Sequence, residues 1–573
     1  MASRKSNPNI MFIFSDQQRH DSLGCYGQSL PVSPNLDRMA QQGIMFRNAF
    51  TPQPVCGPAR ACLQTGLYAT ETGCFRNGIA LPLDADTIAR RLSKAGYEVG
   101  YIGKWHLATT SGTSAEPLDV SKSYRDAAIP PERRGGYADY WLAADVLENT
   151  SHGIEGGYMW NGDMKKVDFC GYRVDAVTDF VLEYLRTRDG SKPFFLFLSY
   201  IEPHHQNDRN RFEGPPGSRE KFGEFDVPGD LEGTGGDWRE QYPDYLGCCH
   251  AIDRNMKRIT DLIKELGMDE NTLVIYTSDH GCHFRTRNNE YKRSCHESSI
   301  HVPLLMQGPG FIGGKVIDAM VSTLDLVPTV LRAAGAAIPS YVKGQPLQDL
   351  VDGNQDDWKQ EVLIQVSESQ VGRAMRTPKW KYSVSAPGLK GNYHVRSNLY
   401  VEEFLYDLMK DIHEKNNLVN DPSLVAVRDS LRERLKTLIV ASGEMEPEIV
   451  PANQLPTEPA LDVSGRIHLD GEGLLAMDVV PAAFPGAQPI EIPLVEIIEE
   501  ILDIPVLITV RGKKWRGSII KEGAKSEKKL YLKGGNGELA PLEHILSPVF
   551  DQEIMMISLL PPGNASKHHI VIC

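Results

Sequence analysis

Short runs of apolar residues recur along the first half of the chain, and several of them end in Asp, Gly or His. The clearest runs cover residues 9–16, 98–103, 193–200, 273–278 and 302–306. Runs that are apolar on both faces are typical of central strands in a parallel sheet. Between them lie segments with the periodicity of helices, at residues 87–95, 172–187 and 250–266.

This alternation of strands and helices predicts an α/β fold, with a large, mostly parallel sheet covered by helices on both faces. In such a sheet, ligands bind beyond the carboxyl ends of the strands. Polar residues gather at those ends here, so we expect the functional site there. Two weakly periodic stretches, 109–164 and 206–244, are expected to be long loops that shape the rim of a pocket.

The pattern changes in the second half of the chain. Short strands are expected at 361–366, 373–375, 380–384 and 404–408, followed by a helix at 423–441. They predict a smaller C-terminal subdomain in which one helix packs on an antiparallel sheet. We expect four parts: an α/β domain (1–345), this subdomain (346–444), a linker (445–488), and an extra α+β segment of unknown role with a helix at 495–502 (489–573).

The composition excludes several classes of protein. Hydrophobic residues make up 41% and charged residues 24% of the chain, as in soluble globular proteins. The net charge of −14 disfavours binding to nucleic acid or to an anionic membrane. No apolar run is long enough to span a bilayer, and the first residues lack the apolar stretch of a secretory signal. We therefore expect a cytoplasmic protein without membrane or nucleic-acid partners, and leave a homo-oligomer open.

Two aspartates follow predicted parallel strands and can meet at one edge of the sheet. Asp16 ends the first apolar run, and Asp279 follows the run at 273–278. Their carboxylate oxygens suit Ca²⁺ or Mg²⁺. The neighbouring Gln17 and His280 add an amide oxygen and an imidazole nitrogen. Each aspartate taken singly fits the N-terminal cap of a helix better, so the metal site depends on the set as a whole.

Cationic residues lie near the same strand ends. Lys104 and His106 stand two apart after a strand, so their side chains can point to one side. Arg285 and Arg287 lie shortly after Asp279 and are candidates for binding an anionic substrate. A lone Lys or His at such a position fits a solvated loop better.

One short segment carries the sharpest signal. It reads Cys56-Gly57-Pro58-Ala59-Arg60 and is followed by Thr65-Gly66. Alone, it fits a buried cysteine beside a turn. It resembles, however, the signature of the type I, formylglycine-dependent sulfatases of the alkaline phosphatase-like superfamily. The run from Gly96-Tyr97 to Gly103-Lys104-Trp105-His106 resembles the second signature of that family, and the resemblance extends from Asn9 to about Pro422.

The resemblance implies a sulfuric ester hydrolase with a small-molecule or carbohydrate sulfate ester as substrate, most readily a sulfated carbohydrate. A maturation enzyme would oxidise Cys56 to formylglycine, whose hydrate would attack sulfur with the help of a divalent metal, Ca²⁺ or alternatively Mg²⁺. By the same resemblance, the catalytic residues are Cys56, Arg60, Lys104, His106, His204 and Lys292. The metal ligands are Asp16, Gln17, Cys56, Asp279 and His280. Asn77 would help to hold the pocket, although a turn asparagine before Gly78 explains it nearly as well.

The roles implied for the catalytic residues differ. Arg60 would steady the hydrate, and His106 would accept the proton of its remaining hydroxyl. His204 and Lys292 would serve the leaving-group oxygen, as acid and as positive charge. Two positions depart from the family pattern: many relatives carry Asp where Gln17 stands and Asn where His280 stands. The loss of one negative charge should weaken metal binding or change the preferred ion.

Two alternatives stay open at this point. Relatives with the same pocket can hydrolyse phosphonate or phosphate esters. An inert binding protein that keeps the fold would retain an unmodified Cys56, although such a protein would be expected to lose several of the catalytic residues.

Overall fold

The computed structural model describes residues 7–110 and 123–452 in full, and the backbone of a further set of strands after residue 462. The chain divides into two compact units. One contains residues 1–109, 123–385 and 390–453, and the other contains residues 110–122, 386–389 and 454–573. The bounds of the four parts expected from the sequence stay a prediction.

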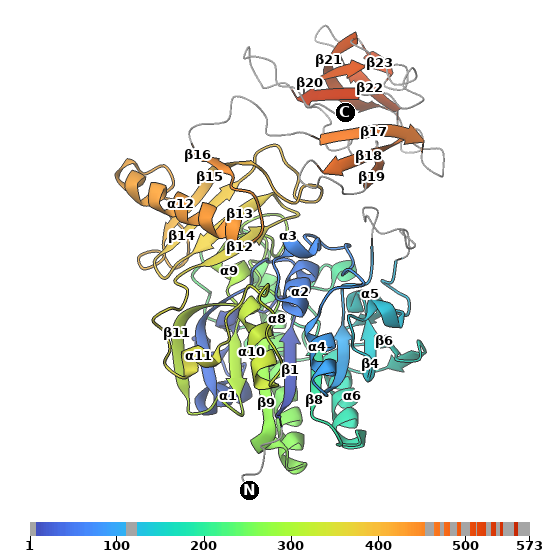
Figure 1. Cartoon of the computed structure of the whole chain (residues 1–573), viewed down its shortest axis with the longest axis vertical. Coiled ribbons are helices and arrows are strands. Elements are labelled where there is room, and N and C mark those ends of the chain that lie inside the picture. Colours follow the sequence, from blue (N-terminus) through green and yellow to red (C-terminus); the bar gives the residue numbers. More distant parts are fainter. Residues whose placement is uncertain are drawn as a thin grey trace. The chain divides into compact units, whose positions relative to one another are not determined.

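A large sheet forms the centre of the first unit (Figure 1). Its strands lie in the order β11 (Lys315–Ser322), β2 (Ile44–Phe50), β10 (Leu304–Gln307), β9 (Thr272–Ser278), β1 (Asn9–Ser15), β8 (Phe194–Ser199), β3 (Glu98–Lys104), β4 (Tyr140–Ala144), β6 (Gly156–Asn161) and β5 (Ser151–His152). Strand β7 (Lys166–Phe169) pairs with β6. The central run from β9 to β4 is parallel throughout, which confirms the predicted mostly parallel sheet.

Helices pack on both faces of this sheet. The side chains of β1 alternate: Ile10, Phe12 and Phe14 belong to one core, and Met11 and Ile13 to the other. The first core is covered by α2 (Cys56–Thr65), α4 (Ile88–Lys94) and α10 (Leu326–Ala333). The second is covered by α1 (Pro34–Gln42), α6 (Arg173–Thr187) and α8 (Trp238–Glu265). Shorter helices are α3 (Ala69–Thr72), α5 (Leu147–Thr150), α7 (Ser218–Phe222), α9 (Glu297–Ile300) and α11 (Gln348–Val351).

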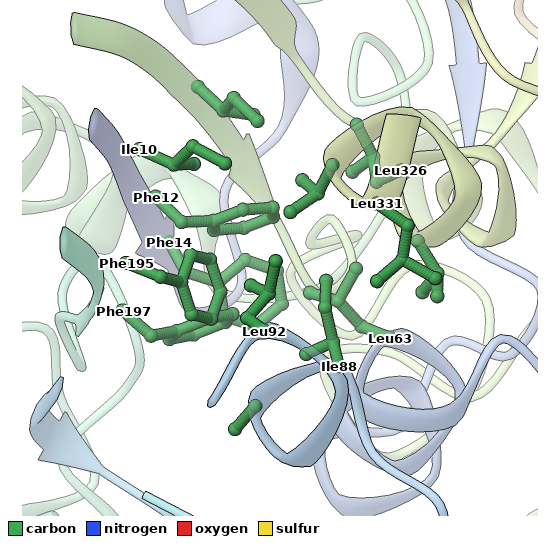
Figure 2. Close-up of a cluster of buried hydrophobic side chains, with 14 of the residues drawn as sticks. Ile10, Phe12, Phe14, Leu63, Ile88, Leu92, Phe195, Phe197, Leu326 and Leu331 are labelled. Carbon is green, nitrogen blue, oxygen red and sulfur yellow. The ribbon is translucent and has the colours of Figure 1, made fainter. Parts of the chain in front are cut away.

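Aromatic rings fill the first core beneath the strand ends. Figure 2 shows Phe12 and Phe197 from adjacent strands facing leucine and isoleucine side chains of the covering helices. The rings of Phe12 and Phe197 stack with their centroids 4.7 Å apart, and Tyr101 of β3 stacks on Phe197 at 5.2 Å. These ring contacts hold β1, β8 and β3 together. They therefore fix the relative positions of the polar residues that follow these strands.

The C-terminal subdomain of the first unit is a smaller sheet packed by one long helix, as expected. Its strands are β12 (Val362–Val366), β13 (Gly372–Arg376), β14 (Trp380–Ser385), β15 (Leu399–Asp407) and β16 (Glu448–Val450), and its helix is α12 (Val425–Ala441). Strands β12 to β15 are antiparallel. Strand β16, which the sequence pattern did not predict, adds in parallel to β15.

Three expectations about local structure were wrong. The run at 302–306 forms β10, which is antiparallel to both of its neighbours, because a buried strand has the same apolar pattern in either direction. The expected loop at 109–164 contains β4, β5 and β6, which extend the sheet. The expected loop at 206–244 ends in α8, which begins at Trp238 and continues through Pro243. Because proline is disfavoured inside a helix, the sequence pattern did not predict the first turns of α8.

The described strands of the second unit form two sheets. One is formed by β17 (Val463–Leu469), β18 (Leu475–Pro481) and β19 (Ile490–Pro493). The other has the order β23 (Leu539–Pro541), β22 (Lys529–Lys533), β21 (Lys513–Glu522), β20 (Pro505–Val510) and β24 (Met555–Leu559). Strands β17 and β18 fall within the expected linker, and the expected helix at 495–502 lies outside the described residues. Among the described residues, we find no helix with the length and apolar character needed to cross a membrane.

Candidate active site

The ends of parallel strands bring the predicted acidic residues together. Strands β1 and β9 are paired in register up to Ser15 and Ser278, so the next residues, Asp16 and Asp279, leave the sheet side by side. Lys104 closes β3, and its Nζ lies 2.9 Å from Asp16 Oδ2. All three side chains are fully buried. The expected location of the site, beyond the carboxyl ends of the strands, is therefore where these charged residues meet.

Cys56 is the first residue of α2. Pro58 stands in the first turn, where its missing N–H costs no helical hydrogen bond, and Gly66 ends the helix with a φ of 75°. The N–H of Gly57 donates to Asn77 Oδ1 at 2.9 Å. Asn77 therefore holds the start of the helix that presents Cys56, which places this predicted pocket residue at the site.

Charged groups surround the sulfur of Cys56. Lys292 Nζ lies 2.9 Å from Sγ, His280 Nε2 lies at 3.2 Å and Asp16 Oδ1 at 3.5 Å. Burial disfavours the thiolate, but the positive charges of Lys292 and Lys104 outweigh it and hold the pKa of Cys56 well below its ordinary value. The surroundings of this position thus stabilise negative charge.

Arg60 lies one helical turn after Cys56 and faces the same pocket. Its Nη2 lies 3.0 Å from Asp16 Oδ2 and 3.5 Å from Asp279 Oδ2. Its Nη1 donates to Ser199 Oγ at 2.7 Å. These contacts fix the guanidinium beneath the cysteine.

Four side chains offer a set of metal donors. One ligand atom each from Asp16, Cys56, Asp279 and His280 lies within 4.8 Å of the others, and all four residues are buried. Burial and the neighbouring Asp16 raise the pKa of Asp279 to about 6. Two buried carboxylates repel each other, and a divalent cation bound between them offsets this repulsion. This set of donors can therefore hold such an ion.

Gln17 adjoins this set. Its N–H donates to Asp279 Oδ1 at 3.0 Å, and its Oε1 accepts from Lys292 Nζ at 3.4 Å. Its backbone is left-handed, with a φ of 69°. The amide oxygen thus already has a partner in Lys292, and coordination by Gln17 stays a prediction.

The two predicted catalytic histidines flank the cysteine. His204 Nε2 lies 3.1 Å from Lys292 Nζ, and its Nδ1 lies 2.6 Å from the carbonyl oxygen of His205. Burial and the charge of Lys292 lower the pKa of His204, so the free site favours neutral imidazole. His106 lies beside Cys56 and helps to lower the pKa of its thiol, while its buried Nδ1 has no partner. The Nε2 atom of His204 thus lies beside the same ammonium group that contacts the Cys56 sulfur.

The two predicted substrate arginines contact residues outside the immediate surroundings of Cys56. Arg287 donates to the backbone carbonyls of His413 and Glu414, and so ties its loop to the C-terminal subdomain. Arg285 donates to Asn210 and stacks over Tyr291, with its guanidinium carbon 4.7 Å from the ring centre. Within the described residues, neither guanidinium contacts Cys56 or the metal donors. Their role in substrate binding stays a prediction.

Two residues at the site were not predicted. Glu148 is buried, and its Oε1 lies 3.2 Å from Lys104 Nζ. Burial opposes its ionisation, but Lys104 outweighs it and lowers the pKa of Glu148 to about 2. Ser199, the acceptor for Arg60, ends β8, and a polar residue at that strand end was a usable signal. No such signal marked Glu148, because it lies in a stretch that was expected to be a loop.

Comparison with known proteins identifies a family. The family model for sulfatases matches residues 8–336, and the model described as N-sulphoglucosamine sulphohydrolase, C-terminal, matches residues 289–441. The chain is 27% identical to an ulvan-active sulfatase of Formosa agariphila, over 77% of this chain and 82% of that protein. It is 26% identical to human arylsulfatase A, over 77% of this chain and 88% of that protein.

Two further relatives extend the comparison. The N-acetylglucosamine-6-O-sulfatase of Bacteroides thetaiotaomicron is 25% identical over 75% of this chain and 86% of that protein. A solved structure described as a complex with its substrate, D-glucosamine-2-N,6-O-disulfate, matches 78% of this chain and 100% of that chain, with a TM-score of 0.62 and 22% identity. Because the sulfatase model spans more than half of the residues and ends after the last of the buried residues around Cys56, the chain belongs to the sulfatase family and is a sulfuric ester hydrolase of alkaline phosphatase-like fold.

Proposed function

We propose that this enzyme hydrolyses a sulfate ester on a carbohydrate, with formylglycine derived from Cys56 as the nucleophile. The observation that carries the proposal is the surroundings of the Cys56 sulfur: Lys292, His280 and Asp16 all lie within 3.5 Å of it. Lys292 and His280 can supply positive charge here. The equatorial oxygens of a sulfate ester need such charge when an oxygen nucleophile at this position attacks the sulfur. A formylglycine-generating maturation enzyme is therefore part of the proposal.

The residues around Cys56 divide the chemistry between them. The formylglycine hydrate supplies one hydroxyl that attacks sulfur and a second that later expels sulfate. His106, which lies beside Cys56 and helps to lower the pKa of its thiol, accepts the proton of the second hydroxyl. Arg60 and Lys104 hold the Asp16 carboxylate in place and add positive charge beneath the nucleophile.

Lys292 and His204 lie together and serve the leaving-group oxygen. Neutral His204 directs Nε2 at Lys292 while Nδ1 faces a carbonyl oxygen. An anionic sulfate ester placed against Lys292 offsets the positive charge that lowers the pKa of His204. Binding of the substrate therefore favours the protonated imidazole, which is the form that acts as the acid.

Ca²⁺ is the ion we propose, with Mg²⁺ as the alternative. Asp16, Asp279 and His280 would hold it together with the modified Cys56 side chain and the Gln17 amide. The two carboxylates are hard oxygen donors, which both ions prefer. The ion would supply positive charge to the sulfate oxygens.

The names of the relatives support a carbohydrate substrate. They include enzymes described as active on ulvan and as acting on N-acetylglucosamine 6-O-sulfate groups, and an endo-4-O-sulfatase. A cytoplasmic location stays a prediction.

A matched hydrolysis assay tests the proposal. The purified enzyme is given an aryl sulfate, an aryl phosphonate, an aryl phosphodiester and a panel of sulfated mono- and oligosaccharides. We expect the sulfate esters to be hydrolysed fastest, and one sulfated sugar to exceed the aryl sulfate in kcat/KM. A faster aryl phosphonate would instead support the phosphonate hydrolase alternative.

A further inference from the structure

A loop of the C-terminal subdomain contacts both sides of the active site through one carboxylate. Glu368 lies between β12 and β13, and its side chain is only 6% exposed. Its Oε1 accepts a hydrogen bond from the backbone N–H of Asn77 at 2.6 Å. Its Oε2 lies 2.5 Å from Arg293 Nη2. One side chain therefore joins two segments that lie more than two hundred residues apart in the sequence.

The first contact leads to the nucleophile. Asn77, fixed at its backbone by Glu368, accepts the N–H of Gly57 with its side chain. Gly57 directly follows Cys56 at the start of α2. A shift of Glu368 would therefore be passed through one residue to the helix turn that carries Cys56.

The second contact leads to the leaving-group side. Arg293 directly follows Lys292, and its N–H donates to the carbonyl oxygen of Pro54 at 3.2 Å. Its own carbonyl accepts from Ser369 Oγ at 2.7 Å. The residue after Lys292 is thus held between the segment before Cys56 and the loop that carries Glu368.

Both partners of the ion pair have an unfavourable backbone conformation. Arg293 has a φ of 68° and Glu368 a φ of 65°, in the left-handed region that residues other than glycine seldom adopt. Such conformations persist only where the surrounding contacts determine them. The paired side chains and the Ser369 contact supply that constraint here.

We infer that Glu368 is a positioning residue: it sets the separation between the Cys56 turn and the Lys292 segment, and thereby makes the C-terminal subdomain part of the catalytic apparatus. Glu368 touches none of Cys56, Lys292 or the metal donors, so it acts through Asn77 and Arg293. The inference rests on the proposed function of Cys56 and Lys292. Displacement of a catalytic group by about 1 Å can lower turnover about a hundredfold.

The first test compares Glu368→Gln with a matched control. Glu402→Gln removes another buried, ion-paired carboxylate of the same subdomain, whose partners Arg428 and Arg432 lie outside the site. With a small aryl sulfate, we expect Glu368→Gln to lower kcat about 10- to 100-fold with little change in KM, while Glu402→Gln keeps the kcat of the unaltered enzyme. Formylglycine content is measured for each variant, and kcat is expressed per modified site. An unchanged kcat in Glu368→Gln would overturn the inference.

Arg293→Gln breaks the same ion pair from the other side and serves if Glu368→Gln fails to fold. We expect a similar loss of kcat in Arg293→Gln, and no further loss in the double variant, because both changes break the ion pair between Arg293 and Glu368. Arg293→Gln also removes the ion pair with Glu290, whose side chain is exposed and which contributes little. Independent losses that multiply in the double variant would contradict the inference.

Amide hydrogen exchange tests the positioning without turnover. Glu368→Gln should speed exchange in peptides that cover residues 54–62, 74–80 and 288–296 relative to the unaltered enzyme, and Glu402→Gln should not. If the unaltered enzyme failed to hydrolyse sulfate esters, the proposed function would fail, while this exchange pattern would still decide the role of Glu368. Equal exchange in both variants would refute it.

Discussion

Cys56 combines a buried position with a surplus of positive charge around its sulfur. Lys292, Lys104 and His280 all favour a negative charge there. A cysteine with a purely structural role, such as Cys62 in the same helix, shows the opposite effect, since burial raises its pKa well above the ordinary value. The difference between these two cysteines shows that the charges around Cys56 suit a reacting group.

Replacement of Cys56 tests its chemical role. Cys56→Ala should abolish hydrolysis of an aryl sulfate, because alanine cannot be oxidised to formylglycine. The unfolding free energy should change by about 1 kcal/mol or less, since few atoms are removed. Cys62→Ala is the control and should keep its turnover. Normal activity in Cys56→Ala would contradict the mechanism.

The metal donors are tested by Asp279→Asn. This change keeps the shape of the side chain but removes a hard anionic ligand, so bound metal should fall and turnover should drop by several orders of magnitude, since metal-assisted charge stabilisation contributes several kcal/mol. Elemental analysis gives the metal content. Asp253→Asn is the control, because this buried carboxylate accepts from the backbone N–H groups of Asn35 and Leu36 outside the site. Full turnover after chelation and dialysis would exclude a role for the metal.

At the scale of elements, parallel strands explain why much of the site could be predicted. Asp16, Lys104 and Asp279 each stand at the end of an apolar run. The carboxyl ends of parallel strands lie at the same edge of a sheet, so the proximity of these residues could be predicted from the sequence alone. Contacts between distant loops have no such signal. Glu148 lies in a stretch whose strands are too short to show a clear periodicity, and Glu368 reaches the site from another subdomain. The sequence pattern of β10 also does not show whether the strand runs parallel or antiparallel to its neighbours.

The aromatic layer below the strand ends is tested by Phe197→Ala. The ring is 2% exposed and stacks on Phe12 and Tyr101. Its removal leaves a cavity in the first core, so the unfolding free energy should fall by about 3–5 kcal/mol. Chemical denaturation measures the change. Ile312→Ala, at a residue that is 67% exposed, should change the unfolding free energy by less than about 0.5 kcal/mol. Equal effects of the two substitutions would contradict the packing described here.

At the scale of the whole molecule, every residue to which we assign a role lies before Ala452. The end of the first unit has structural requirements of its own. Glu444 is buried and its Oε2 lies 2.8 Å from Arg373 Nη2, and β16 pairs with β15. A shortened chain must therefore keep both features in order to fold.

We expect a chain that ends at Ala452 to keep its turnover of a small aryl sulfate. Any loss should be confined to long sulfated polysaccharides, and should depend on salt if charged groups after residue 452 hold the polymer. Steady-state kinetics on both substrates, at low and high ionic strength, make the comparison. A folded, soluble truncation that has lost turnover of the aryl sulfate would show that the second unit completes the site.

The central claim is that Cys56 is the precursor of the nucleophile, and mass spectrometry of the peptide that contains it is the most direct test. In an active preparation, we predict a peptide about 18 Da lighter than the unmodified one, the difference between a thiol and an aldehyde. Its fraction should rise in proportion to specific activity across preparations. A fully active preparation in which that peptide carries only unmodified cysteine would contradict the claim.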